Sequence, residues 1–295
     1  MAVPLIVTEY ARAARSERTK EAYRDDWKDY SKWARDKNFL PLPSSPDAVA
    51  LYLAERAETL KPSTLARRLV GIRTAHKLAG FDLPTNAPVI RDTLTGIKRQ
   101  RGSALSQKAP LTIDNLREIC KTEKTTRNRA ILVVGFAAAL RRSEIAALNH
   151  QDVSFVKEGL ILFLPQRKND QEGKGTSIGI TFGSHIHTCP VRSLRDWLAE
   201  RGTNPGPLFT TKSGRRFAGQ DIAAIVKQGA VRIGLDPKDY GGHSLRAGFA
   251  TEAARAGASE RSIMRQTGHR SIPMVRRYIR EGSIFTENAA ALIDL

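Results

Sequence analysis

Hydrophobic and polar residues alternate along the first hundred positions with the spacing of amphipathic helices. From Ser16 to Lys37, apolar and aromatic residues recur at helical intervals with charged residues between them. A proline-rich break follows, after which Ser45 or Asp47 can cap a second helix. A third helix is expected from Pro62 to Gly80 and a fourth from Ala87 to Lys98. The pattern therefore predicts an N-terminal bundle of helices.

The pattern changes in the second half of the chain, where short strands join the helices. A largely buried helix is expected from Arg127 to Leu140. Three short runs rich in β-branched and aromatic residues then predict a small antiparallel sheet, namely Val153 to Val156, Leu160 to Leu164 and Ser177 to Thr181. The sequence thus predicts a mainly α protein whose small antiparallel sheet belongs to an α+β second domain.

A polar and basic segment separates the two halves. The fourth helix leads into a stretch bounded by glycine and proline, which is typical of an interdomain linker. We expect an N-terminal helical domain at residues 1–102, the linker at residues 103–110 and the second domain at residues 111–295. The two predicted domains would form a clamp.

Composition and charge narrow the class of protein. The chain of 295 residues carries a formal charge of +18, and a polyanion is the simplest partner for such an excess. Cys120 and Cys189 are too few for a disulfide framework, so a reducing cytosol is expected. The longest apolar run, Ala130 to Leu140, is too short to span a bilayer, which predicts a soluble protein.

Lysine and arginine outnumber acidic residues most clearly between Leu51 and Lys108. Within this region, the third helix combines one apolar stripe with a basic face, which can enter a major groove or lie along phosphates. We predict DNA contacts from four of its residues, Arg67, Arg68, Arg73 and Lys77. A solvated basic surface is the alternative. His76 falls on the apolar side of the helix and is assigned to the core.

The residues most suggestive of chemistry lie near the end of the chain. His243 and Arg246 are three positions apart and therefore leave the same face of a helix. Gly268 precedes His269, and the following Ser-Ile-Pro predicts a turn into a helix that carries Tyr278. Histidine and arginine donate hydrogen bonds to anionic oxygen, and a phenol can act as a nucleophile. The combination indicates attack on a phosphate.

This set of residues closely resembles the tyrosine recombinase, or phage integrase, family. That family carries a His-x-x-Arg, then a Gly-His, then a tyrosine nucleophile nine residues later, and all three elements stand here in that order and spacing. The resemblance implies that His243, Arg246, His269 and Tyr278 are active-site residues.

Two further elements extend the resemblance. The segment Ala139 to Glu144 matches the family's Gly-Leu-Arg-x-Ser-Glu-like turn, with alanine in place of glycine, and implies that Arg141 grips the scissile phosphate. Arg142 is adjacent, and periodicity alone does not choose between the two arginines. The polar loop between the second and third strands matches a hairpin whose lysine reaches into the DNA minor groove. That match implies Lys168, with Lys174 as the competitor.

The resemblance implies a site-specific recombinase that cuts and rejoins DNA by transesterification through a 3′-phosphotyrosyl intermediate, for integration, excision or resolution. Because one ester replaces another, neither ATP nor a divalent metal is required in principle, and no cofactor is expected. His185, His187 and Cys189 alternate, but no fourth ligand lies nearby in the sequence, so we expect no metal site.

The resemblance also implies partners. These are double-stranded DNA with an inverted-repeat recombination site and further copies of the chain in a tetramer on that DNA. The tail from Asn288 to Leu295 has one apolar face and cannot hold itself folded. It docks either on its own body or, as the resemblance implies, in a neighbouring subunit. Such an enzyme would act in the cytoplasm, in association with the nucleoid.

Two other functions fit parts of the pattern. The first is a type IB topoisomerase-like or hairpin-forming enzyme, which keeps the tyrosine chemistry without strand exchange. The second is a non-catalytic DNA-binding regulator, which keeps only the basic surface. Replacing Tyr278 separates these possibilities, because only a catalytic protein forms a covalent adduct through that residue.

Overall fold

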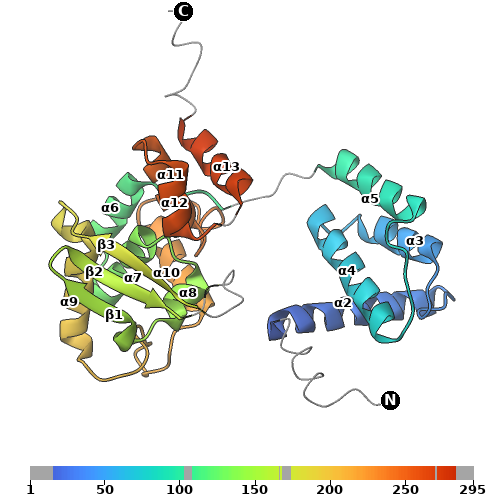
Figure 1. Ribbon diagram of the computed structural model, residues 1–295, viewed down its shortest axis with the longest axis horizontal. Helices are drawn as coiled ribbons and strands as arrows, with labels where there is room; N and C mark the ends of the chain where they lie inside the picture. The colour runs from blue at the N-terminus through green and yellow to red at the C-terminus, as the bar shows by residue number, and fades with distance from the viewer. Residues whose placement is uncertain (1–15, 103–107, 166, 168–173, 270, 284–295) are drawn as a thin grey trace, which may run out of the picture. The chain divides into compact units, whose positions relative to one another are not determined.

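The computed structural model describes residues 16–102, 108–165, 167, 174–269 and 271–283 (Figure 1). The predicted hairpin lysine, Lys168, and the predicted docking tail lie outside these residues. Contacts between Cα atoms divide the chain into two compact units, Met1–Ser106 and Gln107–Leu295. Each unit has a hydrophobic core of its own. Within the described ranges, no helix is long and apolar enough to cross a membrane.

The N-terminal unit is built from helices, as the periodicity predicted. Ser16 and Ser45 cap two of them through side-chain oxygens that accept backbone N–H bonds. Proline occupies the first turn of the other helices, where no N–H donor is needed. The helices described in this unit are α2 (Glu17–Asp36), α3 (Pro46–Arg56), α4 (Pro62–Leu78) and α5 (Pro88–Arg101).

Aromatic side chains dominate the core of the N-terminal unit. Tyr30 and Tyr52 meet edge to face with ring centroids 5.0 Å apart, and Trp33 packs against both. His76 is fully buried beside them. Its Nδ1 lies 2.9 Å from the carbonyl oxygen of Ile72, and its Nε2 accepts the backbone N–H of Ser44 at 2.9 Å. Both ring nitrogens are thus satisfied by the backbone, as expected of a core histidine.

The second unit surrounds a central apolar helix, α7 (Thr126–Ala137), with further helices. Residues 130–136 of α7 are all buried. Helices α9 and α11 both pack against α7, and α13 packs along α11 (Figure 1). The other helices described here are α6 (Ile113–Thr122), α8 (Arg142–Ala147), α9 (Pro190–Arg201), α10 (Gly219–Arg232), α11 (Ser244–Arg255), α12 (Glu260–Thr267) and α13 (Ile272–Ser283), with short 3-10 turns η1 (His150–Asp152) and η2 (Ile186–Thr188).

The predicted sheet is present as three antiparallel strands in the order β1-β2-β3. Leu162 in the central strand faces Val153 on one side and Ile178 on the other. Alternate residues of the central strand are buried in the core, which explains the period of two in its sequence. The strands are β1 (Val153–Val156), β2 (Gly159–Leu164) and β3 (Thr176–Thr181).

The predicted helix from Arg127 to Leu140 overruns the observed one by three residues. Helix α7 ends at Ala137, because Ala139 adopts the left-handed conformation with φ of 51°. The N–H of Ala139 bonds to the carbonyl of Phe136 at 2.9 Å, and that of Leu140 bonds to Gly135 at 3.0 Å. These two bonds form a Schellman motif, which usually has glycine at the left-handed position. The apolar periodicity of the sequence continues through this turn, so it gave no signal that the helix ends at Ala137.

Candidate active site

The turn after α7 leads directly into α8, and Arg141 is the N-cap residue of that helix. Its Nη1 lies 2.6 Å from Oε1 of Glu144, and its backbone N–H donates to Oε2 of the same carboxylate at 2.9 Å. Glu144 is only 6% exposed. A buried carboxylate therefore fixes both the backbone and the guanidinium of Arg141.

Arg142 lies outside this arrangement, although it is adjacent in sequence. Its side chain is exposed and its methylene groups cover two glycines. A Cβ atom on Gly242 would lie 2.6 Å from Cβ of Arg142, and one on Gly219 would lie 3.2 Å from Cγ. The structure thus distinguishes two arginines that periodicity alone could not distinguish. Arg141 is turned toward Glu144, and Arg142 lies on the surface.

Arg246 in α11 is the largest fully buried side chain of the described residues, with 1% exposure. Its Nη1 donates to the carbonyl oxygen of Ala139 at 2.9 Å. Its Nε and Nη2 are buried and find no hydrogen-bond partner among the described residues. Burial, with a further contribution from Arg141, lowers the pKa of Arg246 to about 10, so it remains charged at neutral pH. Buried N–H donors without an acceptor are uncommon and mark a place for an anion.

His269 follows the turn that ends α12. Gly268 has a φ of 66° at this turn, and its N–H bonds to Met264 at 2.7 Å. The hydroxyl of Thr267 donates to Ile263 at 2.7 Å and lies 2.9 Å from Nδ1 of His269. Because the hydroxyl proton is already used, Nδ1 carries the imidazole hydrogen and Nε2 keeps its lone pair.

Tyr278 in α13 lies beside His243 and His269. Its hydroxyl lies 3.2 Å from Nε2 of His243, the residue that precedes α11. Its ring stacks on that of His269 with centroids 5.8 Å apart. The tyrosine is 3% exposed and packs in a small apolar cluster with Ala247, Ala250, Ile263 and Val275. The phenol of Tyr278 therefore lies in one cluster with two histidines and two arginines of the same chain, namely His243, His269, Arg141 and Arg246.

Burial and neighbouring cations lower the pKa of both histidines. Burial is the largest cause of the lowered pKa of His243, and Arg246 and Arg141 add to it. Burial also lowers the pKa of His269 to about 4, again with help from these two arginines. At pH 7 the imidazole of His243 is thus able to accept a proton from the phenol beside it.

A family model described as the phage integrase family matches residues 110–283. The chain belongs to this family. The integrase/recombinase XerD homolog of Selenomonas ruminantium is 34% identical over 290 residues, which cover 94% of this chain and 85% of that protein. The tyrosine recombinase XerD of Oceanobacillus iheyensis is 26% identical over 273 residues, covering 89% and 87%. The protein is accordingly a tyrosine site-specific recombinase that cuts and rejoins DNA.

Solved structures share the fold of the recombinase. A XerH site-specific recombinase bound to its palindromic difH substrate, after cleavage, aligns with a TM-score of 0.66 and 19% identity, covering 86% of this chain and 73% of that one. A lambda integrase dimer bound to a COC′ core site aligns with a TM-score of 0.61 and 16% identity, covering 90% and 89%. The mainly helical fold with a small antiparallel sheet is thus that of the integrase catalytic unit with a helical N-terminal unit.

Of the six predicted catalytic residues of the recombinase, five gather in this cluster of arginine, histidine and tyrosine side chains, which we call the pocket, and Lys168 lies outside the described residues. Its competitor Lys174 is described and exposed. Sequence reasoning missed Arg167, which is only 5% exposed and lies 3.6 Å from Glu144. It stands in a polar loop beside a lysine, where the sequence has no signal that separates it from surface charge.

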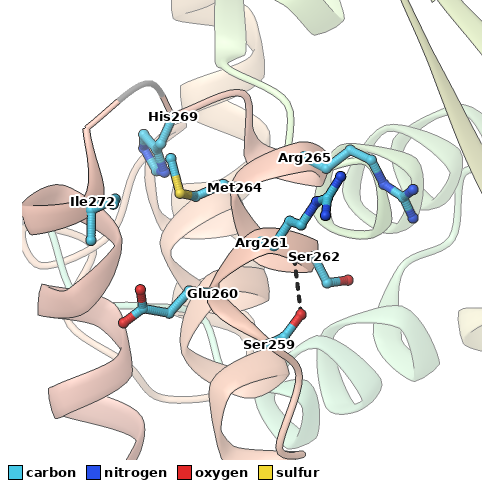
Figure 2. A pocket seen from close by; sticks show the side chains of 8 residues that line it. All are labelled: Ser259, Glu260, Arg261, Ser262, Met264, Arg265, His269 and Ile272. Carbon is cyan, nitrogen blue, oxygen red and sulfur yellow. Dashed lines mark hydrogen bonds between the residues drawn. The ribbon is translucent and has the colours of Figure 1, made fainter.

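A groove of about 710 Å³ adjoins the pocket of the recombinase (Figure 2). Figure 2 shows the side chains of Met264 and Ile272 from neighbouring helices, with His269 beside them. Arginine side chains from α12 border the other side. The residues that line the groove are Ser259, Glu260, Arg261, Ser262, Met264, Arg265, His269 and Ile272. His269 therefore faces the groove as well as Tyr278.

The four predicted DNA contacts of the N-terminal unit differ in their surroundings. Arg73 and Lys77 are exposed on α4. Arg67 is exposed and forms an ion pair with Asp26 at 2.5 Å. Arg68 is 17% exposed and is engaged with Asp29 through Nη1. The guanidiniums of Arg67 and Arg68 thus have acidic partners within their own unit.

The alternating His185, His187 and Cys189 do not converge. Both histidines are exposed, whereas Cys189 is buried and its Sγ accepts the backbone N–H of Gly183 at 3.3 Å. Within the part of the chain that the structure describes, no group of three histidine, cysteine, aspartate or glutamate side chains is placed to hold a metal ion.

Proposed function

We propose that Tyr278 is the nucleophile of the recombinase and that it attacks a DNA backbone phosphate. The phenolic oxygen forms a bond to phosphorus while the bond from phosphorus to the 5′-oxygen breaks, which gives a 3′-phosphotyrosyl enzyme and a free 5′-hydroxyl. The 5′-hydroxyl of a partner strand then attacks the adduct and releases the tyrosine. The observation that carries this proposal is the distance of 3.2 Å between the Tyr278 hydroxyl and Nε2 of His243.

His243 accepts the phenolic proton in this scheme. A free phenol has a pKa near 10, so it needs a base and nearby cations to react at neutral pH. Support comes from the lowered pKa of His243, which leaves its imidazole neutral and able to take the proton. Lys168 donates a proton to the leaving 5′-oxygen as the general acid.

Arg141 and Arg246 hold the non-bridging oxygens of the phosphate and stabilise the charge that develops on them. The buried Nε and Nη2 of Arg246, which have no acceptor among the described residues, support this role. A planar guanidinium donates two parallel bonds to such oxygens, which an ammonium group does not.

His269 donates to a non-bridging oxygen only after it has gained a proton. In the structure its Nδ1 hydrogen points to Thr267 and its Nε2 has a lone pair. A bound phosphate supplies the negative charge that favours the imidazolium, and His269 then donates through Nε2. We therefore infer that DNA binding is accompanied by proton uptake at this residue.

The substrate in this proposal is duplex DNA with an inverted-repeat recombination site, bound by a tetramer in the cytoplasm. The N-terminal domain, residues 1–102, and the catalytic domain, residues 111–295, both bind the DNA and are joined by a linker at 103–110. Arg73 and Lys77 make phosphate contacts, which their exposure on α4 supports. Replacing either by glutamine lowers the slope of log affinity against log salt by about 1.

The C-terminal segment joins neighbouring subunits in the tetramer. Its apolar Ala-Ala-Ala-Leu-Ile run and Asp294 complement the groove, which offers apolar Met264 and Ile272 beside basic Arg261 and Arg265. We propose that the segment of one subunit occupies this groove of the next. Analytical ultracentrifugation on DNA with the segment removed after Ser283 tests this: a tetramer that persists without the segment contradicts the exchange.

The nucleophile is tested on DNA selected by the protein itself. The variant Tyr278→Phe is used to select its binding site from random duplexes, and a nicked suicide duplex is then built around that site. The wild-type protein forms a covalent adduct, whereas Tyr278→Phe binds without one. An adduct with the phenylalanine variant rejects the assignment. Joint molecules from two duplexes, beyond relaxation of supercoils, distinguish strand exchange from topoisomerase activity.

A further inference from the structure

Arg167 is a buried arginine outside the six predicted catalytic residues. It follows β2 in the chain and is 5% exposed. Its Nη2 donates to the carbonyl oxygen of Thr267 at 3.1 Å and lies 3.5 Å from that of Gln266. These carbonyls belong to the last turn of α12, where the backbone has no helical donor for them. The guanidinium thus caps α12 at the end that leads to His269.

Gly268 allows this approach. A Cβ atom at that position would lie 2.4 Å from Nη1 of Arg167 and 2.7 Å from Cζ, so the guanidinium lies directly against the glycine backbone. The positive charge also faces the negative end of the helix dipole. Any larger residue at position 268 would displace Arg167, in addition to straining the left-handed turn.

Arg167 has a second contact, with the carboxylate of Glu144. Its Nε lies 3.6 Å from Oε1 of Glu144, which is the same oxygen that pairs with Arg141 at 2.6 Å. The hydroxyl of Thr267, in turn, holds Nδ1 of His269. A single guanidinium therefore connects the residue that fixes Arg141 with the turn that fixes His269.

The burial of Arg167 is not explained by packing alone. Its pKa is lowered, mainly by burial, and its Nε has no hydrogen-bond partner among the described residues. A buried charge with incomplete pairing destabilises a fold relative to an apolar side chain of similar size. A methionine could fill the same volume without that cost, so the charge serves something other than the core.

We propose that Arg167 is a positioning residue that holds His269 against Tyr278 by tying the end of α12 to Glu144. Its Nη2 is engaged with the carbonyl of Thr267 and its side chain is only 5% exposed, so we assign it to holding these groups and not to contact with the phosphate. This inference rests on the proposed role of His269. A pocket fixed before DNA arrives has less to reorganise when the phosphate reacts.

The test measures single-turnover adduct formation on the nicked suicide duplex for Arg167→Met, His269→Ala and the double variant. A displacement of about 1 Å in a catalytic group costs on the order of 100-fold, and we expect that loss for Arg167→Met at unchanged DNA affinity. In the His269→Ala background the same substitution costs less than about 3-fold, because the group it positions is gone. Arg167→Lys, which keeps a charge and a donor, recovers part of the rate.

Arg201 provides the matched control. It also donates to backbone carbonyls beyond a helix end, including that of Pro207 at 2.7 Å, but its partners lie in the loop after α9. Arg201→Met lowers thermal stability without changing the adduct rate of the folded protein. Equal rate losses for Arg167→Met in the two backgrounds, or a loss matched by Arg201→Met, overturn the inference.

A second substrate distinguishes an effect of Arg167 on His269 from an effect on the general acid. A duplex with sulfur in place of the bridging 5′-oxygen has a leaving group that needs no proton, so it restores activity where the general acid is misplaced. We expect no recovery of Arg167→Met on this substrate. Full recovery shows action through the lysine loop and overturns the inference. If His269→Ala itself cleaves at the wild-type rate, the proposed role of His269 fails instead.

Discussion

Each unit of the recombinase contains a group of neighbouring arginine side chains, and the two groups differ in the number of carboxylates that they contact. In the N-terminal unit, the arginines meet two aspartates of α2 and the hydroxyl of a tyrosine; the group consists of Arg56, Arg67 and Arg68 with Asp26, Asp29 and Tyr52. In the catalytic pocket, one carboxylate stands among the described residues against Arg141, Arg167 and Arg246.

The acidic partners in the N-terminal unit join two helices. Asp26 is 2% exposed, and burial raises its pKa in spite of the two arginines beside it. Arg68 pairs with Asp29 and also donates to the hydroxyl of Tyr52, which itself donates to Asp29 at 2.6 Å. A Cβ atom on Gly71 of α4 would lie 2.9 Å from Cβ of Asp26, so the helices approach closely here. These charges hold α2 against α4.

The pocket is organised differently, because its positive charge exceeds what Glu144 can neutralise. Arg246 has one backbone acceptor and two buried nitrogens without a partner among the described residues. The comparison teaches that arginines serve the fold where acids match them, and that a buried arginine such as Arg246 is available to an external anion where acids are too few. It also predicts opposite outcomes when an arginine is removed from each group.

The largest effect is expected at Arg246. Arg246→Met removes a charge that the phosphate needs, and adduct formation on the suicide duplex falls by at least about 1,000-fold. The fold loses an incompletely paired buried charge, so the midpoint of urea unfolding stays the same or rises. Rapid-quench assays and urea titrations measure the two quantities. A variant that is both inactive and strongly destabilised shows that Arg246 supports the core, against our comparison.

Arg68 is expected to give the reverse result. Arg68→Met leaves Asp29 without its closest cation and Asp26 with one fewer, and lowers the free energy of unfolding of the N-terminal unit by about 2–3 kcal/mol. Urea unfolding followed by the fluorescence of Trp27 and Trp33 reports on this unit. The adduct rate at saturating folded protein remains that of the wild type.

Arg73 on the same helix is the control for this substitution. It is exposed, so Arg73→Met changes the free energy of unfolding by less than about 0.5 kcal/mol and weakens DNA binding instead. Equal stabilities of the Arg68 and Arg73 variants would remove the distinction between a matched and a free arginine in α4.

The burial of His269 among positive charges also predicts how stability depends on pH. Burial is the largest cause of the lowered pKa of His269, which is about 4 against an ordinary value of 6.5, and the charges of Arg246, Arg141, His243 and Arg167 lower it further. Between these pH values the unfolded chain binds a proton that the folded chain does not, so the stability present above pH 6.5 is lost as pH falls toward 4. Thermal unfolding from pH 7.5 to 4.5 measures this loss, and His269→Gln reduces its slope. An unchanged slope contradicts a neutral His269.

DNA reverses the sign of this effect. Because a bound phosphate favours the protonated imidazole, DNA affinity at constant salt rises as pH falls from 7.5 toward 6, and the rise is smaller for His269→Gln. Calorimetric titrations in buffers of different ionisation enthalpy count the protons taken up. Binding without proton uptake would indicate that His269 stays neutral on DNA.

Residues with local partners were predictable from the sequence. His243 and Arg246 share one turn of helix, and the Gly-His turn with a proline after it predicts the return of the chain toward Tyr278. The alternation in β2 likewise predicts the sheet that the structure contains. In each case the signal lies within about ten residues, which is the range over which periodicity and turn chemistry act.

Residues with distant partners were not predictable in this way. Arg167 bonds to a carbonyl 100 positions later, and Arg68 pairs with a carboxylate 39 positions earlier. A basic side chain on a helix edge or in a polar loop has the same local pattern whether it meets solvent, DNA or a buried acid. Only the packing of α2 on α4, and the approach of Arg167 to the end of α12, decide among these partners.

The smallest predicted effect concerns Ala139, whose carbonyl is the one acceptor of Arg246 among the described residues. Glycine at this left-handed position relieves about 1 kcal/mol of backbone strain but adds about 0.4–1 kcal/mol of unfolded-state entropy. Ala139→Gly therefore shifts the free energy of unfolding by less than about 1 kcal/mol and leaves the adduct rate unchanged. Ala139→Val places a β-branched residue at φ of 51° in a fully buried turn, and costs both stability and activity. Urea unfolding and adduct kinetics of the two variants measure this contrast, and a fully active valine variant would show that the turn does not fix Arg246.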